Sequence, residues 1–312
     1  MQLDRTHVVV RPRSNSELCD LTLLLMRQYC IPLCVAFLAG VLPLALMNAA
    51  LIGWLPIEAE LEGIGDDETF AWRSEYLFLM ASLIFLEAPL AGVFATLYIG
   101  QAVFEQRPTW RQVARDAWAT WHRWVWKLGV LRGPVPAVLL LVWTWSLGDA
   151  DGLAVFFMML LLMYVGTLRA FRPHTPEILL LERCPLRRGA TGAVTYSHRS
   201  HLFHTPVAGD SVNRFVTMLL LSGMLTVSLF FAMIFLQGVF AQRWSFNIVA
   251  QLVYVPAAMW IVAGYTVLFR FLCYLDNRIR LEGWDVELGL RAEVQRQFGD
   301  PQSQQPAPGV GG

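Results

Sequence analysis

Long apolar stretches separated by polar connections dominate this chain. A membrane-spanning helix needs roughly 20 mostly apolar residues. Six stretches meet that length, at about 29–55, 76–102, 129–147, 152–171, 215–241 and 247–271. The third begins irregularly, because Arg132, Pro134 and Pro136 crowd its start. The pattern predicts an all-α, polytopic membrane protein with six transmembrane helices.

Charge is distributed very unevenly between the two sets of connections. The connection after the first apolar stretch, PIEAELEGIGDDETFAWRSE, carries seven acids and one arginine. Of the 24 basic residues, all but Arg73 and Arg243 fall in the N-terminal segment, the second and fourth connections, or the C-terminal segment. Short loops rich in Lys and Arg stay in the cytoplasm. We therefore expect both termini in the cytoplasm and the protein in a bacterial inner membrane.

Three of the polar segments show the pattern of helices that lie on a membrane surface. Ser14 and Glu17 have the spacing of a capping box, followed by a stripe of Leu18, Leu21, Leu25 and Tyr29. The second connection places Pro108 in a first helical turn. Its apolar stripe at helical spacing is Trp110, Val113, Ala117, Trp121, Trp124 and Leu128. The fourth connection offers another such helix, and three ordinary loops are the alternative.

Composition supports a membrane environment and narrows the function. Hydrophobic residues make up 56% of the chain and charged residues only 15%, against about 25% charged in soluble domains. The net charge of zero argues against a nucleic-acid partner. The five cysteines form no CxxC pair and are expected to be reduced thiols. The N-terminus shows no cleavable signal peptide, and no cofactor motif is found.

The chain divides into four expected parts. A cytoplasmic N-terminal segment with an amphipathic helix (1–28) precedes a six-span transmembrane domain (29–271). A cytoplasmic charged helix (272–298) and a disordered tail (299–312) follow. The tail is rich in Pro, Gly and Gln, a composition typical of disorder.

The charged stretch YLDNRIRLEGWDVELGLRAE, which follows the last apolar run, is the main candidate surface. Asp276 with Arg280, and Arg278 with Glu282, are spaced for i,i+4 ion pairs, and Gly283 interrupts the helix. One interpretation is a membrane-exit helix stabilised by its own ion pairs. The other is a docking surface for another protein or for the fourth connection of this chain. The interaction candidates are Asp276, Arg278, Arg280, Glu282, Trp284, Asp285 and Glu287.

Three sequence motifs carry a resemblance. RPRSNSELCDL, ILLLERCPLRRG and YLDNRIRLEGWDVEL resemble segments of bacterial six-span inner-membrane proteins of unassigned activity. Those proteins are similar to the membrane domain attached to glycerophosphodiester phosphodiesterases. The resemblance implies a helical membrane protein, sometimes encoded beside other membrane proteins of a shared assembly. It does not imply the phosphodiesterase chemistry, which belongs to a separate metal-binding domain, and no catalytic residue is carried over.

Glu87 is the one acidic residue deep inside a predicted span. A charged side chain at mid-bilayer costs about 2.5–3.5 kcal/mol on insertion scales, so such residues are candidates for function. Pro89 frees a backbone carbonyl nearby. The structural alternative is a protonated Glu87 hydrogen-bonded inside the bundle, for instance to Tyr254, Gln251 or Thr144.

The histidines of HRSHLFH, at positions 198, 201 and 204, invite a metal interpretation. A catalytic zinc wants three protein ligands in tight geometry, and no Cys or acid stands near enough in sequence to complete a set. We expect a basic patch facing lipid headgroups or a partner instead. A membrane-embedded lipid enzyme that uses these histidines with Glu182 is a further alternative.

The sequence favours a non-enzymatic structural or assembly component that acts through its cytoplasmic face. Its expected partners are the lipid bilayer and other membrane or cytoplasmic proteins. The alternative is a small-solute or lipid transporter that uses Glu87.

Overall fold

The computed structural model describes residues 13–61, 66–103, 108–147, 151–186, 194–242, 244 and 247–283. Within these residues the chain is helical and contains no strand. Five helical segments of this part are long and apolar enough to cross a membrane. They are α2 (Cys30–Ile52), α4 (Asp66–Ala91) with α5 (Val93–Ala102), α9 (Asp151–Phe171), α12 (Ala208–Ala241), and η3 (Ala250–Tyr254) with α13 (Val255–Glu282).

The third predicted span is a broken pair of helices. α7 (Trp121–Trp124) and η2 (Val125–Val130) are bent by 50° from α8 (Pro134–Ser146). Gly133 adopts a positive φ of 103° between them, and Pro134 starts the new helix because its fixed φ suits a first helical position. The 13 residues of α8 rise only about 20 Å, so α8 alone is too short to cross a bilayer.

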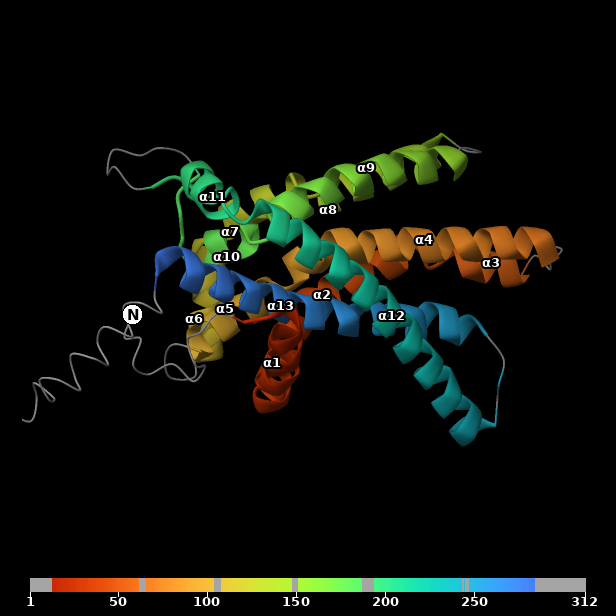
Figure 1. Cartoon of the computed structure of the whole chain (residues 1–312). Coiled ribbons are helices and arrows are strands. Elements are labelled where there is room, and N and C mark those ends of the chain that lie inside the picture. Colours follow the sequence, from red (N-terminus) through yellow and green to blue (C-terminus); the bar gives the residue numbers. More distant parts are fainter. Residues whose placement is uncertain are drawn as a thin grey trace, which may run out of the picture.

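The fifth span is longer than predicted. α12 begins at Ala208 rather than near residue 215 and contains 34 residues, about 51 Å at 1.5 Å per residue. It runs obliquely across the other spans in Figure 1. None of the residues in its most apolar stretch is buried inside the protein. That stretch therefore faces the membrane rather than the bundle.

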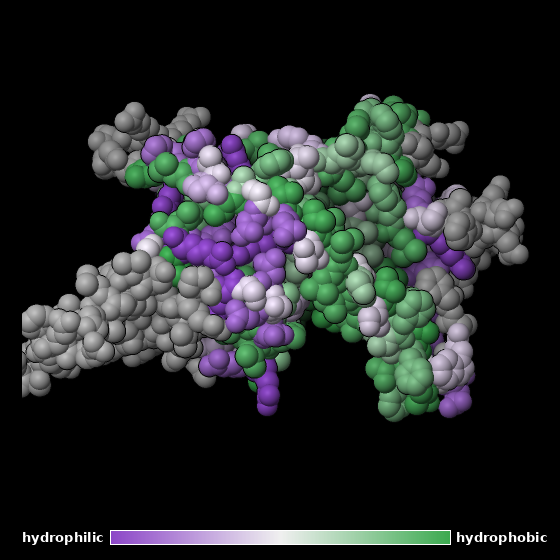
Figure 2. Space-filling view, in the orientation of Figure 1, coloured by the Kyte–Doolittle hydropathy of each residue, from purple (hydrophilic) through white to green (hydrophobic). Residues whose placement is uncertain are grey.

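One end of the bundle collects the shorter helices. α1 (Asn15–Gln28), α6 (Trp110–Ala119), α10 (Thr175–Leu180) and α11 (Tyr196–His204) lie at the end where α13 finishes, and α3 (Leu55–Leu61) lies at the other end (Figure 1). We call the end that contains α1, α6, α10, α11 and the last turns of α13 the basic face. Figure 2 shows hydrophilic side chains gathered there and an apolar belt beside them. This distribution is typical of a polytopic membrane protein.

The amphipathic helix expected at the N-terminus is present as α1. Ser14 and Glu17 form the capping box in both directions. Leu18, Leu25 and Tyr29 of the predicted stripe are buried, and α1 runs crosswise to the spans in Figure 1. A local signal of cap and apolar spacing was therefore sufficient to predict this helix.

The second connection also forms a surface helix. In α6 the cap is Thr109, which makes a capping box with Gln112, so Pro108 precedes the helix instead of occupying its first turn. Val113 and Ala117 are buried. Trp110 and Trp121 of the predicted stripe are exposed instead, as are Trp118 and Trp126. Such rings suit the headgroup region of a bilayer.

The fourth connection differs from the expected surface helix. Its first helix, α10, is almost completely buried, from Thr175 to Leu180. Its second helix, α11, buries Tyr196, Ser200, Phe203 and His204 against the rest of the basic face. The run ILLL is apolar because it fills the centre of this end of the bundle.

Glycine allows two spans to touch. A Cβ atom on Gly40 of α2 would lie 2.1 Å from the carbonyl oxygen of Ala91 on α4. Small residues let helix backbones approach closely in membranes. The crossing of α2 and α4 therefore depends on the missing side chain of Gly40.

Candidate functional site

The last turns of α13 form the centre of the basic face. Asp276 and Asn277 are only 2% exposed, although they lie in the most charged stretch of the chain. A buried charge must be paired and hydrogen-bonded to be tolerated. The described part of the expected charged helix, up to Gly283, is thus a continuation of the sixth span that buries Asp276 and Asn277 and leaves Arg280 and Glu282 exposed.

Asp276 joins three parts of the chain. Its carboxylate lies 2.8 Å from Arg214 of α12 and 3.1 Å from Arg280 one turn later. The backbone N–H of Arg13 donates a third bond to it, at 2.9 Å. The ion pair with Arg280 is the one that the spacing predicted. The bond to Arg214 joins residues 62 positions apart, and the bond to Arg13 joins residues 263 positions apart.

A second network surrounds Arg199 of α11. Its guanidinium binds both carboxylate oxygens of Glu182, at 2.6 and 2.8 Å, and the carboxylate of Glu282 at 2.5 Å. Glu282 also accepts from Arg278 at 2.7 Å, the second predicted pair. The Tyr274 hydroxyl donates to Glu182 at 2.8 Å. Bidentate hydrogen bonds between an arginine and a carboxylate are stronger than hydrogen bonds between neutral groups.

The network fixes the charge state of its members. Partial burial opposes ionisation of Glu182, but hydrogen bonds from Arg199 and Tyr274 outweigh it and lower the pKa of that carboxyl. Hydrogen bonding to Glu182 raises the pKa of Arg199. Burial raises the pKa of the neighbouring Cys184 thiol, and the charge of Glu182 adds to that effect. Glu182 and Arg199 are therefore a charged pair at neutral pH, beside a protonated thiol.

A third set of polar groups lies deeper. Arg214 approaches the amide oxygen of Asn277 at 3.5 Å, which directs the Asn277 NH₂ towards His174 Nε2 at 3.1 Å. The backbone N–H of His174 donates to His204 Nε2 at 3.3 Å, so His204 carries its proton on Nδ1 and donates to the Ser200 carbonyl at 2.8 Å. Burial lowers the pKa of both histidines, that of His204 to about 4. Both rings are neutral.

Three distant motifs therefore meet in one place. Arg13 comes from RPRSNSELCDL, Glu182 from ILLLERCPLRRG and Asp276 from YLDNRIRLEGWDVEL, and all three take part in these networks. The contacts show both the i,i+4 ion pairs of the first interpretation and docking onto the fourth connection of this chain. Docking onto another protein stays a prediction. Trp284, Asp285 and Glu287 lie outside the described residues.

An open pocket of about 440 Å³ adjoins the Arg199 network. Its walls are Leu181, Glu182, Cys184, Val194, His198, Arg199, Leu202 and Arg278. The two arginines and the glutamate on its wall bond to one another or to Glu282. The charges on the pocket wall are therefore balanced only together with Glu282, which lies outside the wall.

The three histidines of α11 have different surroundings. His198 and His201 are exposed, whereas His204 is buried against His174. No group of three His, Cys, Asp or Glu side chains placed to hold a metal occurs in the described part of the chain. The histidines and Glu182 do not converge as the lipid-enzyme alternative requires, because only His198 shares the pocket with Glu182.

Glu87 is fully buried between α4 and α2. Its partner is Asn48, whose side-chain amide donates to Glu87 Oε2 at 2.7 Å. Among the described residues, none of the partners suggested from the sequence, Tyr254, Gln251 and Thr144, bonds to Glu87. Thr144 donates to carbonyls of its own helix, and the backbone carbonyl of Gln251 accepts from Tyr76. Within the described residues, Glu87 Oε1 and Asn48 Oδ1 have no hydrogen-bond partner.

The fold and these contacts define an all-α polytopic membrane protein with a bonded polar layer at one end. Comparison with protein-family models, curated proteins and solved structures finds no match. Sequence reasoning missed Asn48, Arg214 and the buried Glu177–Arg270 pair. Their only signal was a polar residue within or beside an apolar stretch, and its partner lies far away in sequence.

Proposed function

We propose that this chain is a non-catalytic structural or assembly component of a bacterial inner membrane, with the basic face in the cytoplasm. The orientation rests on the distribution of arginine along the sequence, nearly all of which falls in the segments expected on that side. The exposed tryptophans of α6, α7 and η2 support a membrane surface at the same level. The resemblance to bacterial six-span proteins is in line with the location.

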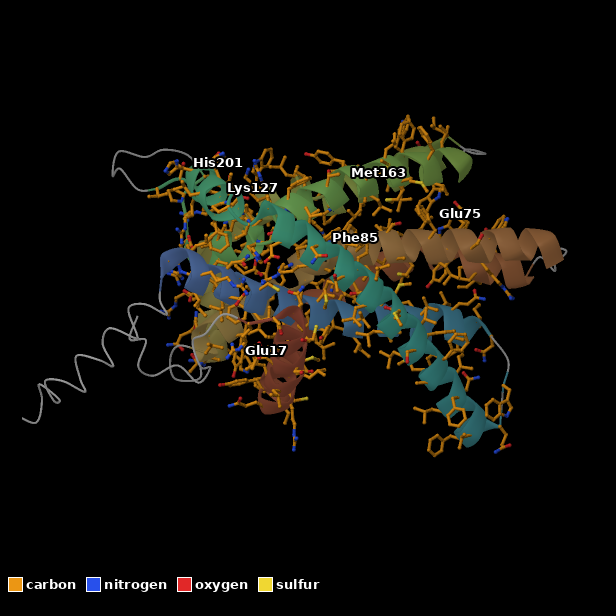
Figure 3. The ribbon with its side chains drawn as sticks, in the orientation of Figure 1. Glu17, Glu75, Phe85, Lys127, Met163 and His201 are labelled. Atoms are coloured by element: carbon orange, nitrogen blue, oxygen red, sulfur yellow. The ribbon has the colours of Figure 1, made fainter. Side chains whose placement is uncertain are left out.

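One observation carries the proposed role. The polar networks join separate parts of the chain: Arg13 bonds to Asp276, Asp276 to Arg214, and Glu182 to Arg199. The basic face is therefore a preorganised surface rather than three loose loops. A preorganised surface costs less entropy when a partner binds. Around this frame, Arg111 and His201 remain exposed, and Figure 3 shows His201 at the outer end of α11. The partner contacts that we propose are made by such exposed groups.

Photo-crosslinking in cells tests the proposal. A photoreactive amino acid is placed at Arg111 or His201, and a control is placed at Met224, which is 73% exposed on the apolar α12. We expect discrete protein adducts from the two basic-face positions and none from Met224. The yield of the adducts should fall when Glu182→Gln is added, because that substitution weakens the polar network around Arg199. Absence of a discrete adduct at both basic-face positions would refute the proposal.

A second candidate function, transport of a small solute or lipid, has one observation in its favour. Glu87 and Asn48 form a fully buried polar pair inside the spans, with two oxygens unbonded among the described residues. Such pairs mark transport paths in other membrane proteins. If this function is correct, Glu87→Gln abolishes solute uptake in proteoliposomes while the protein stays folded. Unchanged uptake, or uptake no greater than in empty liposomes, would exclude it.

A further inference from the structure

Arg132 occupies an unusual place at the break between η2 and α8. It is 5% exposed, and it directly precedes Gly133, whose positive φ lets the chain turn into α8. Its guanidinium donates to the backbone carbonyl of Arg172 and to the hydroxyl of Thr175 at 2.6 Å. A cation is therefore held at the point where the broken span meets the basic face.

A second arginine reaches the same region from α13. Arg270 lies 2.7 Å from Glu177, which is fully buried on α10 two residues after Thr175. One nitrogen of Arg270, Nη2, and one oxygen of Glu177, Oε2, have no hydrogen-bond partner among the described residues. The side chain of Arg270 keeps 17% of its surface exposed, so this corner of the protein is not sealed.

The third arginine comes from α9. Arg169 donates to the carbonyl of Leu86 at 3.0 Å and lies over the ring of Phe85, with 4.1 Å between the guanidinium carbon and the ring centroid. Figure 3 labels Phe85 on α4. The Nε of Arg169 is buried and has no partner within the described part of the chain. The packing of Gly133 against Leu86 and Val165 places Arg132 beside this group.

The charges of this cluster do not balance. Arg132, Arg169 and Arg270 are close enough for their charges to repel one another, and Glu177 is the one carboxylate among the groups that act on Arg132. Arg172, which is exposed beside them, adds a further positive charge. Burying like charges without compensation is costly. The arrangement calls for an anion from outside the described side chains.

We propose that Arg132, Arg169 and Arg270 bind a phosphate group at the boundary between the membrane and the basic face. Guanidinium groups match the geometry of phosphate oxygens through paired N–H donors. The unpartnered Nε of Arg169 and Nη2 of Arg270 supply donors that no described side chain uses. The phosphate is that of an anionic lipid headgroup or of a small soluble phosphate, and both present the same chemistry. The inference does not depend on the proposed assembly function.

Binding to the purified full chain in a neutral detergent tests the inference. Melting temperature is followed with phosphatidylglycerol, with phosphatidylcholine, and with inorganic phosphate against chloride at equal ionic strength. Native mass spectrometry counts the bound lipids. We expect phosphatidylglycerol to raise the melting temperature and to remain bound, and phosphatidylcholine to do neither. A rise with inorganic phosphate but not with phosphatidylglycerol assigns the site to soluble phosphates.

Arg169→Gln is the informative variant, because Arg169 is not the partner of Glu177 and its loss leaves no carboxylate unpaired. We expect its affinity for the phosphate ligand to fall at least tenfold. Arg169→Lys keeps the charge but not the forked pair of N–H donors, so its affinity for the phosphate ligand should lie between that of the wild type and that of Arg169→Gln. Arg115→Gln on the exposed side of α6 is the matched control and should bind as the wild type does. No binding by the wild type, or equal binding by wild type and both Arg169 variants, would overturn the inference.

Discussion

The guanidinium of Arg199 lies 2.5 Å from the carboxylate of Glu282, 83 residues later in the chain. This contact, together with the fork between Arg199 and Glu182, fastens α11 to the last turn of α13. The charged end of the sixth span is therefore held by the fourth connection as well as by its own ion pairs.

Glu182→Gln should destabilise the protein. The Glu182 side chain is 11% exposed and is the shared acceptor of Arg199 and Tyr274. Neutralising Glu182 weakens the fork to Arg199, which keeps Glu282 as its remaining charged partner, and should cost about 1.5–3 kcal/mol. Asp210→Asn is the control, because Asp210 is 53% exposed and lies 3.5 Å from Arg214, and it should cost about 0.5 kcal/mol or less. Melting in detergent measures both, and equal losses would contradict this account.

A double-mutant cycle should show that Glu87 and Asn48 are coupled. Glu87→Leu leaves the Asn48 amide without its acceptor inside the bundle and should cost about 1–3 kcal/mol. Glu87→Gln keeps an acceptor oxygen and should cost less. Asn48→Leu combined with Glu87→Leu should recover part of the loss, because both polar groups are then gone. Additive losses in the double variant would mean that the two side chains act independently.

Gly40→Ala should separate α2 from α4. The new Cβ atom would lie 2.1 Å from the Ala91 carbonyl oxygen, so one backbone has to move. We expect a fall in melting temperature and about 1–3 kcal/mol of destabilisation, as for overpacked cores. Gly223→Ala in α12 is the matched control, because nothing lies within 4 Å of that position. It should be neutral or stabilising by about 0.5–1 kcal/mol, since alanine favours a helix. A tolerated Gly40→Ala would show that the two backbones are farther apart.

Stability should fall in mild acid through His204. Burial lowers its folded pKa to about 4, below the ordinary value of 6.5, so the unfolded chain binds this proton first. The contribution is present above pH 6.5 and is lost as the pH falls towards 4, up to about 3 kcal/mol. His204→Gln should flatten the pH dependence of the melting temperature between pH 6.5 and 4, and the exposed His201→Gln should not. The same slope in both variants would exclude His204 as the source.

Thiol labelling tests the sidedness of the chain. In a variant whose native cysteines are replaced by serine, Glu58→Cys and Arg111→Cys occupy the acidic and basic ends of the bundle. With both termini in the cytoplasm, an impermeant maleimide labels position 58 in intact spheroplasts and position 111 only after lysis. Labelling of both positions before lysis would remove the six-span arrangement.

Local contacts were predictable from the sequence, and distant ones were not. The Ser14–Glu17 capping box and the Asp276–Arg280 and Arg278–Glu282 pairs depend on residues three or four positions apart, so helical spacing is sufficient to find them. The positions of the spans follow from apolar content, whereas the extra length of α12 and the break before α8 were not predicted.

The partners that complete the site on other helices could not be predicted from the sequence. Asp276 with Arg214, and Glu87 with Asn48, come from different helices, and one sequence contains no signal for which faces of two spans meet. The burial of α10 was missed for a related reason. A short apolar run such as ILLL has the same composition at a membrane surface and at the centre of a bundle.

The junction between Arg13 and the end of α13 has a consequence for biosynthesis. Asp276 accepts from the Arg13 backbone, Arg280 donates to the Arg13 carbonyl, and the buried stripe of α1 packs on α13. α1 therefore finds its neighbour α13 only after that later span has been synthesised. Until then the apolar side of α1 lacks its contact with α13, and a chain cut short before Asp276 would lack the polar contacts that hold Arg13 at the start of this helix.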